Sequence, residues 1–288
     1  TIGAQTIPYT PNTLNQYSEV NGTPYTWSLN GNLTSDGVAT YSYDSENRLT
    51  SVVRGATTVS FTDDPFGRRI SKTVNGVPTR FLYDGAQLLA DTTATGTITQ
   101  YWLYGASLDE PLQLTKGTKK YYYLADGLGS PVMLTSTTGV VLESYKYDAY
   151  GRPLVLSTRG NRFAFTGREY DRETGLSDYR TRTYHPGIGR FMQRDPLGPL
   201  PDVNLYRYVG NGPPNWRDPY GLFWETVWDI ANIIYDLATE DYESLAFDTV
   251  ATATPFLPAG LTKATKAVDK MSDVIKTAKR CPLPKPSV

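Results

Sequence analysis

Up to about residue 222, apolar and polar residues alternate along the chain with a period of two. The segments 40–43 and 100–103 are examples, and both are rich in aromatic residues. Such a period is typical of half-buried β-strands, in which successive side chains point to opposite faces. Stretches rich in Gly, Asn, Asp and Pro separate these segments and predict turns. The pattern therefore predicts an all-β body.

A turn motif recurs within this alternating region. The motif consists of an aromatic residue, an aspartate and usually a Gly or Asn before Arg. Its aspartates Asp44, Asp64 and Asp84 lie 20 residues apart. Asp accepts hydrogen bonds from amides further along a turn, and Gly or Asn tolerates positive φ, so the motif fits a hairpin corner. Since one hairpin cannot bury its apolar face alone, we expect the hairpins to stack into a curved, spiral sheet with an aromatic core.

The period changes to about 3.6 after Leu222, which is typical of amphipathic helices. One helix is predicted to begin at Phe223, and a second is predicted over 262–279. The fold class expected from the whole pattern is therefore mainly β, an array of β-hairpins followed by a small α-helical segment.

Composition supports the strand-and-turn prediction and narrows the chemistry. The chain contains 22 Tyr, 25 Gly and 20 Pro, and its formal net charge of -1 predicts no nucleic-acid contact and no attraction to an anionic membrane. A single Cys and a single His exclude a disulfide framework and a cysteine zinc site, so we expect no metal and no cofactor. The start of the chain does not resemble a signal peptide, and no apolar stretch predicts stable membrane insertion.

The segment from Phe163 to Leu222 carries the most specific motifs. It contains Thr-Gly-Arg-Glu-Tyr-Asp at 166–171, Gly-Arg-Phe at 189–191 and two Asp-Pro-x-Gly turns at 195–198 and 218–221. Together with the tandem Tyr-Asp turns, these blocks resemble the YD-repeat (Rhs) family and its repeat-associated core domain. The resemblance covers about residues 20–222.

The resemblance implies both an architecture and a biological role. Repeats of this family form a hollow shell around a toxic carboxyl-terminal segment, and the shell frees the toxin by self-cleavage, for competition between bacteria. It implies an enclosed segment of the same chain, an immunity protein and secretion-system components as partners, and secretion, delivery to a target cell or a place on the cell surface. The expected domains are a YD-repeat sheet over 1–155, the core domain with its cleavage motif over 156–222 and a helical pre-toxin segment over 223–288. No toxin activity is readable in the last of these.

The family's cleavage motif is a Pro, four residues and Asp-Pro-x-Gly-Leu. Pro213, Asp218, Pro219, Gly221 and Leu222 match it. In the family this motif marks cleavage immediately after the Leu, so the resemblance implies that the bond between Leu222 and Phe223 is cut.

Two aspartates provide chemistry for such a cut. Without a metal, Cys or His, two carboxylates sharing a proton can hydrolyse a peptide, one as base and the other as acid. Asp195 and Asp218 each begin an Asp-Pro-x-Gly turn that holds the carboxylate rigidly. The flanking Arg190 and Arg194 could position a carboxylate or stabilise an oxyanion. The predicted activity is a single-turnover aspartyl autoprotease.

Three alternatives stay open on the sequence. In the first, both Asp-Pro turns have only a structural role. In the second, the protein is a non-enzymatic cell-surface protein whose repeats bind carbohydrate or neighbouring cells. The third is a small complete toxin in the last 66 residues, from 223 to 288. His185 stands where the family commonly has Asp, and we expect it to have a structural role.

Overall fold

The computed structural model describes residues 7–199 and 203–222. The chain divides into two compact units, Thr1–Thr226 and Val227–Val288. The predicted helical segment over 223–288, including Phe223, lies outside the described residues. Among the described residues, no helix has the length and apolar character needed to span a membrane.

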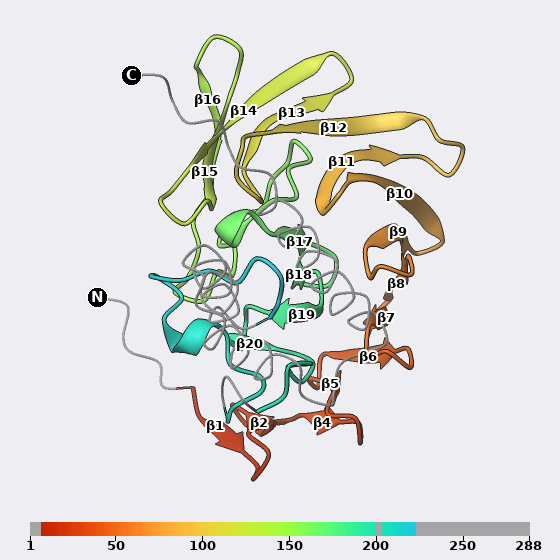
Figure 1. Ribbon diagram of the computed structural model, residues 1–288, viewed down its shortest axis with the longest axis vertical. Coiled ribbons are helices and arrows are strands. Elements are labelled where there is room, and N and C mark those ends of the chain that lie inside the picture. Colours follow the sequence, from red (N-terminus) through yellow and green to blue (C-terminus); the bar gives the residue numbers. More distant parts are fainter. Residues whose placement is uncertain (1–6, 200–202, 223–288) are drawn as a thin grey trace, which may run out of the picture. The chain divides into compact units, whose positions relative to one another are not determined.

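One antiparallel sheet of thirteen strands contains most of the repeat region, and its strands follow one another in chain order. In Figure 1 these strands follow a curved path from β4 to β16. This confirms the predicted mainly β fold and its curved array of hairpins. The strands are β4 (Thr26–Trp27), β5 (Leu33–Ser35), β6 (Ala39–Tyr43), β7 (Leu49–Arg54), β8 (Thr57–Asp63), β9 (Arg69–Val74), β10 (Val77–Asp84), β11 (Gln87–Thr92), β12 (Ile98–Tyr104), β13 (Pro111–Lys116), β14 (Lys119–Ala125), β15 (Pro131–Thr135) and β16 (Val141–Ser144).

Repeated aspartates close several of the turns between strands, as predicted for Asp44 and Asp64. One carboxylate oxygen of Asp44 accepts hydrogen bonds from the amides of Glu46 and Arg48, both at 2.9 Å. Asp126 accepts from the amides of Leu128 and Ser130 in the same way, at 2.9 Å each. A local side-chain bond of this kind satisfies amides that the sheet leaves unpaired at a corner. The turn motif therefore fixes the corners at which these aspartates stand.

The alternation along each strand places one set of side chains in a buried core. Trp102 is 1% exposed and packs edge-on against the ring of Phe163, with ring centroids 5.3 Å apart. Tyr123 is 8% exposed and accepts a hydrogen bond from the Trp102 indole at 3.2 Å. Packing is thus the main role of the aromatic residues on this face. Carbohydrate binding would have to use exposed rings such as Tyr101 and Tyr122, which are 38% and 37% exposed.

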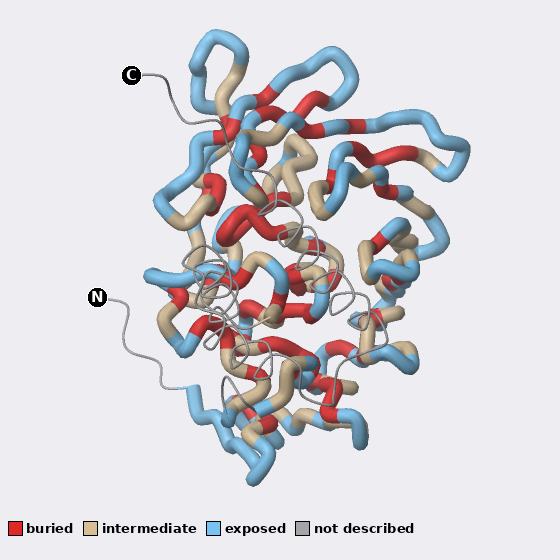
Figure 2. The backbone as a smooth tube through the Cα atoms, in the orientation of Figure 1, coloured by how far each residue is buried: buried red, intermediate tan, exposed pale blue. Residues whose placement is uncertain are grey.

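Two smaller sheets complete the described part of the chain. The four-stranded sheet has an aromatic core in which Tyr179, Tyr184 and Tyr208 are each at most 1% exposed. Most residues of β18, β19 and β20 are buried, and they lie in the red central part of the tube in Figure 2. The elements are β1 (Tyr9–Pro11), β2 (Tyr17–Val20) and β3 (Thr23–Pro24) in one sheet, β17 (Glu169–Asp171), β18 (Leu176–Tyr179), β19 (Arg182–His185) and β20 (Arg190–Phe191) in the other, and the 3-10 turns η1 (Phe165–Gly167) and η2 (Val209–Asn211).

Buried ion pairs join the four-stranded sheet to the thirteen-stranded one. Arg69 of β9 lies 2.7 Å from a carboxylate oxygen of Asp171 and 3.0 Å from one of Asp178. Arg162 lies 2.7 Å from Asp91 of β11. A buried charge is costly to leave unpaired, so these pairs favour one arrangement of the two sheets over others. The Arg69 pairs hold β17 and β18 on the repeat sheet, whereas the Arg162 pair holds the segment that precedes β17.

Candidate active site

Asp195 and Asp218 meet at a single arginine. The Nη2 atom of Arg182 lies 2.8 Å from Oδ2 of Asp195 and 3.6 Å from Oδ2 of Asp218. The two aspartates are 7% and 3% exposed, and Arg182 is 3% exposed. Its guanidinium also lies 3.7 Å from the centre of the Phe191 ring, a cation–π contact that keeps it in place. The site is therefore a buried pair of carboxylates that shares one cation.

Each aspartate uses its second oxygen to close its own turn. Oδ1 of Asp195 accepts from the amide of Leu197 at 2.9 Å. Oδ1 of Asp218 accepts from the amide of Leu222 at 3.1 Å. This division leaves the Oδ2 atoms of both residues facing Arg182, which is the rigid geometry that the two Asp-Pro-x-Gly sequences suggested.

The turn between β18 and β19 binds the chain just before Leu222. The Thr181 hydroxyl donates to the carbonyl of Tyr220 at 2.7 Å and to that of Gly221 at 2.8 Å. Arg182 Nε also donates to the Gly221 carbonyl. Arg180 donates to the carbonyl of Pro219. Three consecutive residues, the two of this turn and the first of β19, thus hold three consecutive carbonyls, and this brings Leu222 to Asp218.

Burial changes the acidity of the site. It raises the pKa of Asp218 to about 6, and the nearby Asp195 carboxylate adds to the rise, whereas Arg182 and the Leu222 amide oppose it. Burial also lowers the pKa of the Arg182 guanidinium, against the two carboxylates. Asp218 is therefore protonated at mildly acidic pH while Asp195 forms the shorter ion pair with Arg182.

The other residues singled out from the sequence lie in different surroundings. The guanidinium of Arg190 lies 3.8 Å from the centre of the Tyr17 ring and donates to the carbonyl of Asn15. Arg194 is exposed, and its side-chain stem lies against Gly31. Both arginines thus contact the amino-terminal part of the described chain. The guanidinium that contacts both aspartates is that of Arg182, which the sequence analysis did not select.

The remaining motif residues support the turn, and His185 lies elsewhere. Pro213 is buried, Pro219 and Leu222 are half-buried and Gly221 is buried. His185 Nε2 lies 3.3 Å from a carboxylate oxygen of Asp36, in a contact between β19 and the loop after β5. This contact is structural, as expected for His185.

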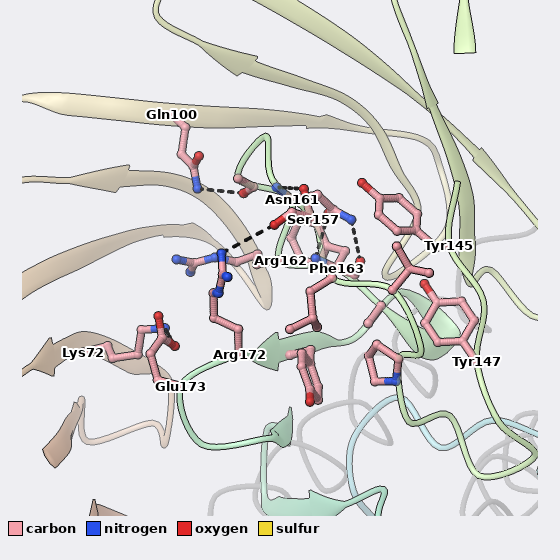
Figure 3. Close-up of a pocket in the computed structure, with 16 residues that line it drawn as sticks. Lys72, Gln100, Tyr145, Tyr147, Ser157, Asn161, Arg162, Phe163, Arg172 and Glu173 are labelled. Atoms are coloured by element: carbon pink, nitrogen blue, oxygen red, sulfur yellow. Dashed lines mark hydrogen bonds and ion pairs between the residues drawn. The ribbon is translucent and has the colours of Figure 1, made fainter. Parts of the chain in front are cut away.

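A pocket of about 140 Å³ opens in the same unit (Figure 3). Lys72, Arg162 and Arg172 lie among its sixteen lining residues, which include neither Asp195 nor Asp218. Lys72 pairs with Glu173 at 3.0 Å, and Arg162 pairs with residues of both sheets. The part of the chain that the structure describes contains no group of three or more metal-ligating side chains.

Replacing Gly221 by alanine is expected to destabilise the fold. Gly221 has φ +67°, and a Cβ there would lie 2.5 Å from the carbonyl oxygen of Tyr179. Gly55 has a similar φ of +57° with nothing within 4 Å, so Gly55→Ala is a matched control that carries only the conformational cost. Overpacking adds about 1–3 kcal/mol, so Gly221→Ala should lower the free energy of unfolding by about that much more than Gly55→Ala. Urea denaturation measures both, and equal losses would contradict the tight fit.

The sequence of the chain is similar to a known protein family and to several known proteins. A family model described as teneurin YD-shell matches residues 3–213. The tRNA nuclease WapA of Bacillus subtilis strain 168 is 36% identical over 242 residues, which is 80% of this chain and 10% of the relative. The double-stranded DNA deaminase toxin A of Burkholderia cenocepacia is 28% identical over 218 residues, 63% of this chain and 15% of the relative. The chain thus spans only a small part of the length of these relatives.

Solved structures with the same fold are components of toxin complexes. The TcdB2–TccC3 structure aligns with 68% of this chain and 11% of its own, at a TM-score of 0.57 and 22% identity. A Tc holotoxin pore of Photorhabdus luminescens aligns with 75% of this chain and 13% of its own, at a TM-score of 0.58 and 18% identity. At these identities the similarity establishes the fold and nothing further.

Proposed function

The chain belongs to the teneurin YD-shell family, and we propose that it is the carboxyl-terminal part of a toxin-enclosing shell that cleaves itself once, after Leu222. The observation that carries the proposal is the buried pair of aspartates around Arg182, with Leu222 bonded to one of them. Two neighbouring carboxylates that share one cation can provide both the base and the acid that peptide hydrolysis uses.

The proposed reaction is a single hydrolysis of the Leu222–Phe223 peptide bond. Asp195, ionised in its pair with Arg182, takes a proton from water as the water oxygen attacks the Leu222 carbonyl carbon. Asp218, whose pKa burial raises to about 6, gives its proton to the leaving nitrogen of Phe223. The C–N bond breaks, leaving a carboxyl group on Leu222 and an amino group on Phe223. Arg182 holds both carboxylates and fixes the Gly221 carbonyl beside the cut.

Enclosure is the second part of the proposal. The relatives are named as nucleases and as a deaminase toxin, and the family model that matches this chain covers the repeat sheet described above. We therefore assign residues 223–288 to the start of the enclosed segment, which the cut separates from the shell. The same proposal includes delivery outside the producing cell by a secretion system, for competition between bacteria. It also includes an immunity protein as a partner.

Separation of the fragments under different conditions tests this function. The purified chain should elute as one species in size-exclusion chromatography under native conditions and run as two bands on a denaturing gel, because the sheet retains the cleaved segment. A chain that runs as one band of full length has not been cut, and the function then fails. Two fragments that elute separately under native conditions would contradict enclosure.

The pH dependence of cleavage follows from the raised pKa of Asp218. The acid form is needed to protonate the leaving nitrogen, and its fraction falls as the pH rises through about 6. The rate should therefore be highest at and below about pH 6 and fall as the pH rises, with a slope that approaches tenfold per pH unit well above this value. Full-length chain from cell-free synthesis, shifted to buffers from about pH 6 to about pH 8, gives the profile on a denaturing gel. A rate that rises with pH over this range would exclude Asp218 as the acid.

A further inference from the structure

One side chain links the residues before the cut to the thirteen-stranded sheet. The Arg180 guanidinium donates to both carboxylate oxygens of Asp109, at 2.6 and 3.0 Å, and to the carbonyl of Ala86 at 3.3 Å. The same guanidinium donates to the carbonyl of Pro219 and lies 5.2 Å from the centre of the Tyr220 ring. Ala86 and Asp109 lie in the β10–β11 and β12–β13 connections, so two hairpins of the sheet meet the cleavage motif at one arginine.

Asp109 is also held by a residue other than Arg180. It is 6% exposed, and a second arginine, Arg168, donates to it at 2.8 Å. These two arginines hold the pKa of Asp109 below its usual value although burial opposes the shift. Asp109 is therefore a charged anchor within the fold rather than a surface partner of Arg180.

The backbone of Arg180 is in a conformation that arginine rarely adopts. Its φ is +67°, at the first position of the two-residue turn between β18 and β19. Glycine or asparagine would adopt this conformation at lower cost, and other residues lose about 1–2 kcal/mol there. The contacts of the side chain must offset that cost, which is consistent with a role for the guanidinium itself.

We propose that Arg180 is a positioning residue that makes self-cleavage depend on the repeat sheet. The proposal rests on the proposed function and deepens it. Arg180 does not act on the peptide bond; it holds Pro219 and Tyr220 so that Gly221 reaches Arg182 and Leu222 reaches Asp218. Because Asp109 and Ala86 hold the other side of the guanidinium, the cut is made only after the β10–β13 part of the sheet has folded. Release of the cargo before the shell has formed is thereby prevented.

Two matched lysine substitutions in the full 288-residue chain test the proposal. Arg180→Lys keeps a charge for Asp109 but cannot form the planar set of contacts to Asp109, Ala86 and Pro219 together. Arg162→Lys is the control, since Arg162 is equally buried and also bridges the two sheets, from Asp91 at 2.7 Å to Glu169 at 3.3 Å. Arg180→Lys should slow cleavage about 10- to 100-fold, as expected when a reacting group is misplaced, while Arg162→Lys cleaves at the parent rate.

Hydrogen exchange of the Leu222 amide tests the positioning role of Arg180 independently of cleavage. In chains that also carry Asp195→Asn and stay intact, the Leu222 amide should exchange hydrogen faster with Arg180→Lys than with Arg162→Lys, because its bond to Asp218 loosens. Arg180→Lys and Arg162→Lys with equal cleavage rates and equal exchange would overturn the positioning role. A parent chain that never cleaves would refute the proposed function, while the exchange comparison would still decide on Arg180.

Discussion

The chain with Asp218→Asn is expected to remain a single uncleaved species on a denaturing gel. Asparagine can still accept the Leu222 amide through its side-chain oxygen, so the turn is kept, but it cannot deliver a proton at the pH of the reaction. A general acid contributes at least about 100-fold to such a rate, and a single-turnover cut slowed by that factor leaves intact chain. Asp195→Asn should have the same outcome, because it removes the base.

A turn aspartate of the repeat sheet provides the control for these substitutions. Asp126 closes its turn through two amide hydrogen bonds, as Asp44 does, and lies outside the candidate site. Asp126→Asn should therefore leave cleavage unchanged. Parent-like cleavage in both Asp195→Asn and Asp218→Asn would dispose of the aspartyl mechanism.

The loss of Arg182 should have the largest effect on stability. Arg182→Met keeps the length of the side chain but leaves two buried carboxylates without the cation they share. The carbonyls of Gly221 and Leu205 lose donors as well. Breaking a buried ion pair from one side costs about 3–5 kcal/mol, so unfolding in urea should begin at clearly lower concentration and cleavage should stop.

Neutralising the two unpaired aspartates tests why Arg182→Met loses stability. Adding Asp195→Asn and Asp218→Asn to Arg182→Met should restore part of the lost stability, because neutral amides do not repel each other. A triple variant no more stable than Arg182→Met would show that the arginine acts mainly through its packing on Phe191. Arg182→Met with parent stability and cleavage would contradict the site as described.

The sheet could be predicted from the sequence because its signals are local. A period of two marks each strand, and an aspartate such as Asp44 or Asp126 closes a turn with amides two and four residues away. Neither signal depends on how distant parts of the chain meet. The predicted helices lie outside the described residues and stay predictions.

The site could be predicted only in part, for the same physical reason. Asp195 and Asp218 each carry a turn motif that is visible in the sequence, whereas Arg182 meets them only because β19 packs beside both turns. Arg190 and Arg194 are close to Asp195 in sequence, yet they contact Tyr17 and Gly31. Proximity along the chain is a poor guide here, because Arg190 lies in β20 while Arg194 and Asp195 lie in the loop after it, where the direction of each side chain depends on the local turn. The available signal for Arg182 was its place two residues before Tyr184, which puts it on the same face of β19 as that buried ring.

Self-cleavage after Leu222 is tested most directly by mass spectrometry of the purified protein under denaturing conditions. Two fragments are predicted, with the break between Leu222 and Phe223 and one water molecule added in total. A break after Gly221, whose carbonyl accepts from Thr181 and Arg182, would differ by the mass of one leucine and would contradict the assigned bond. A single species with the mass of the complete sequence would contradict self-cleavage itself.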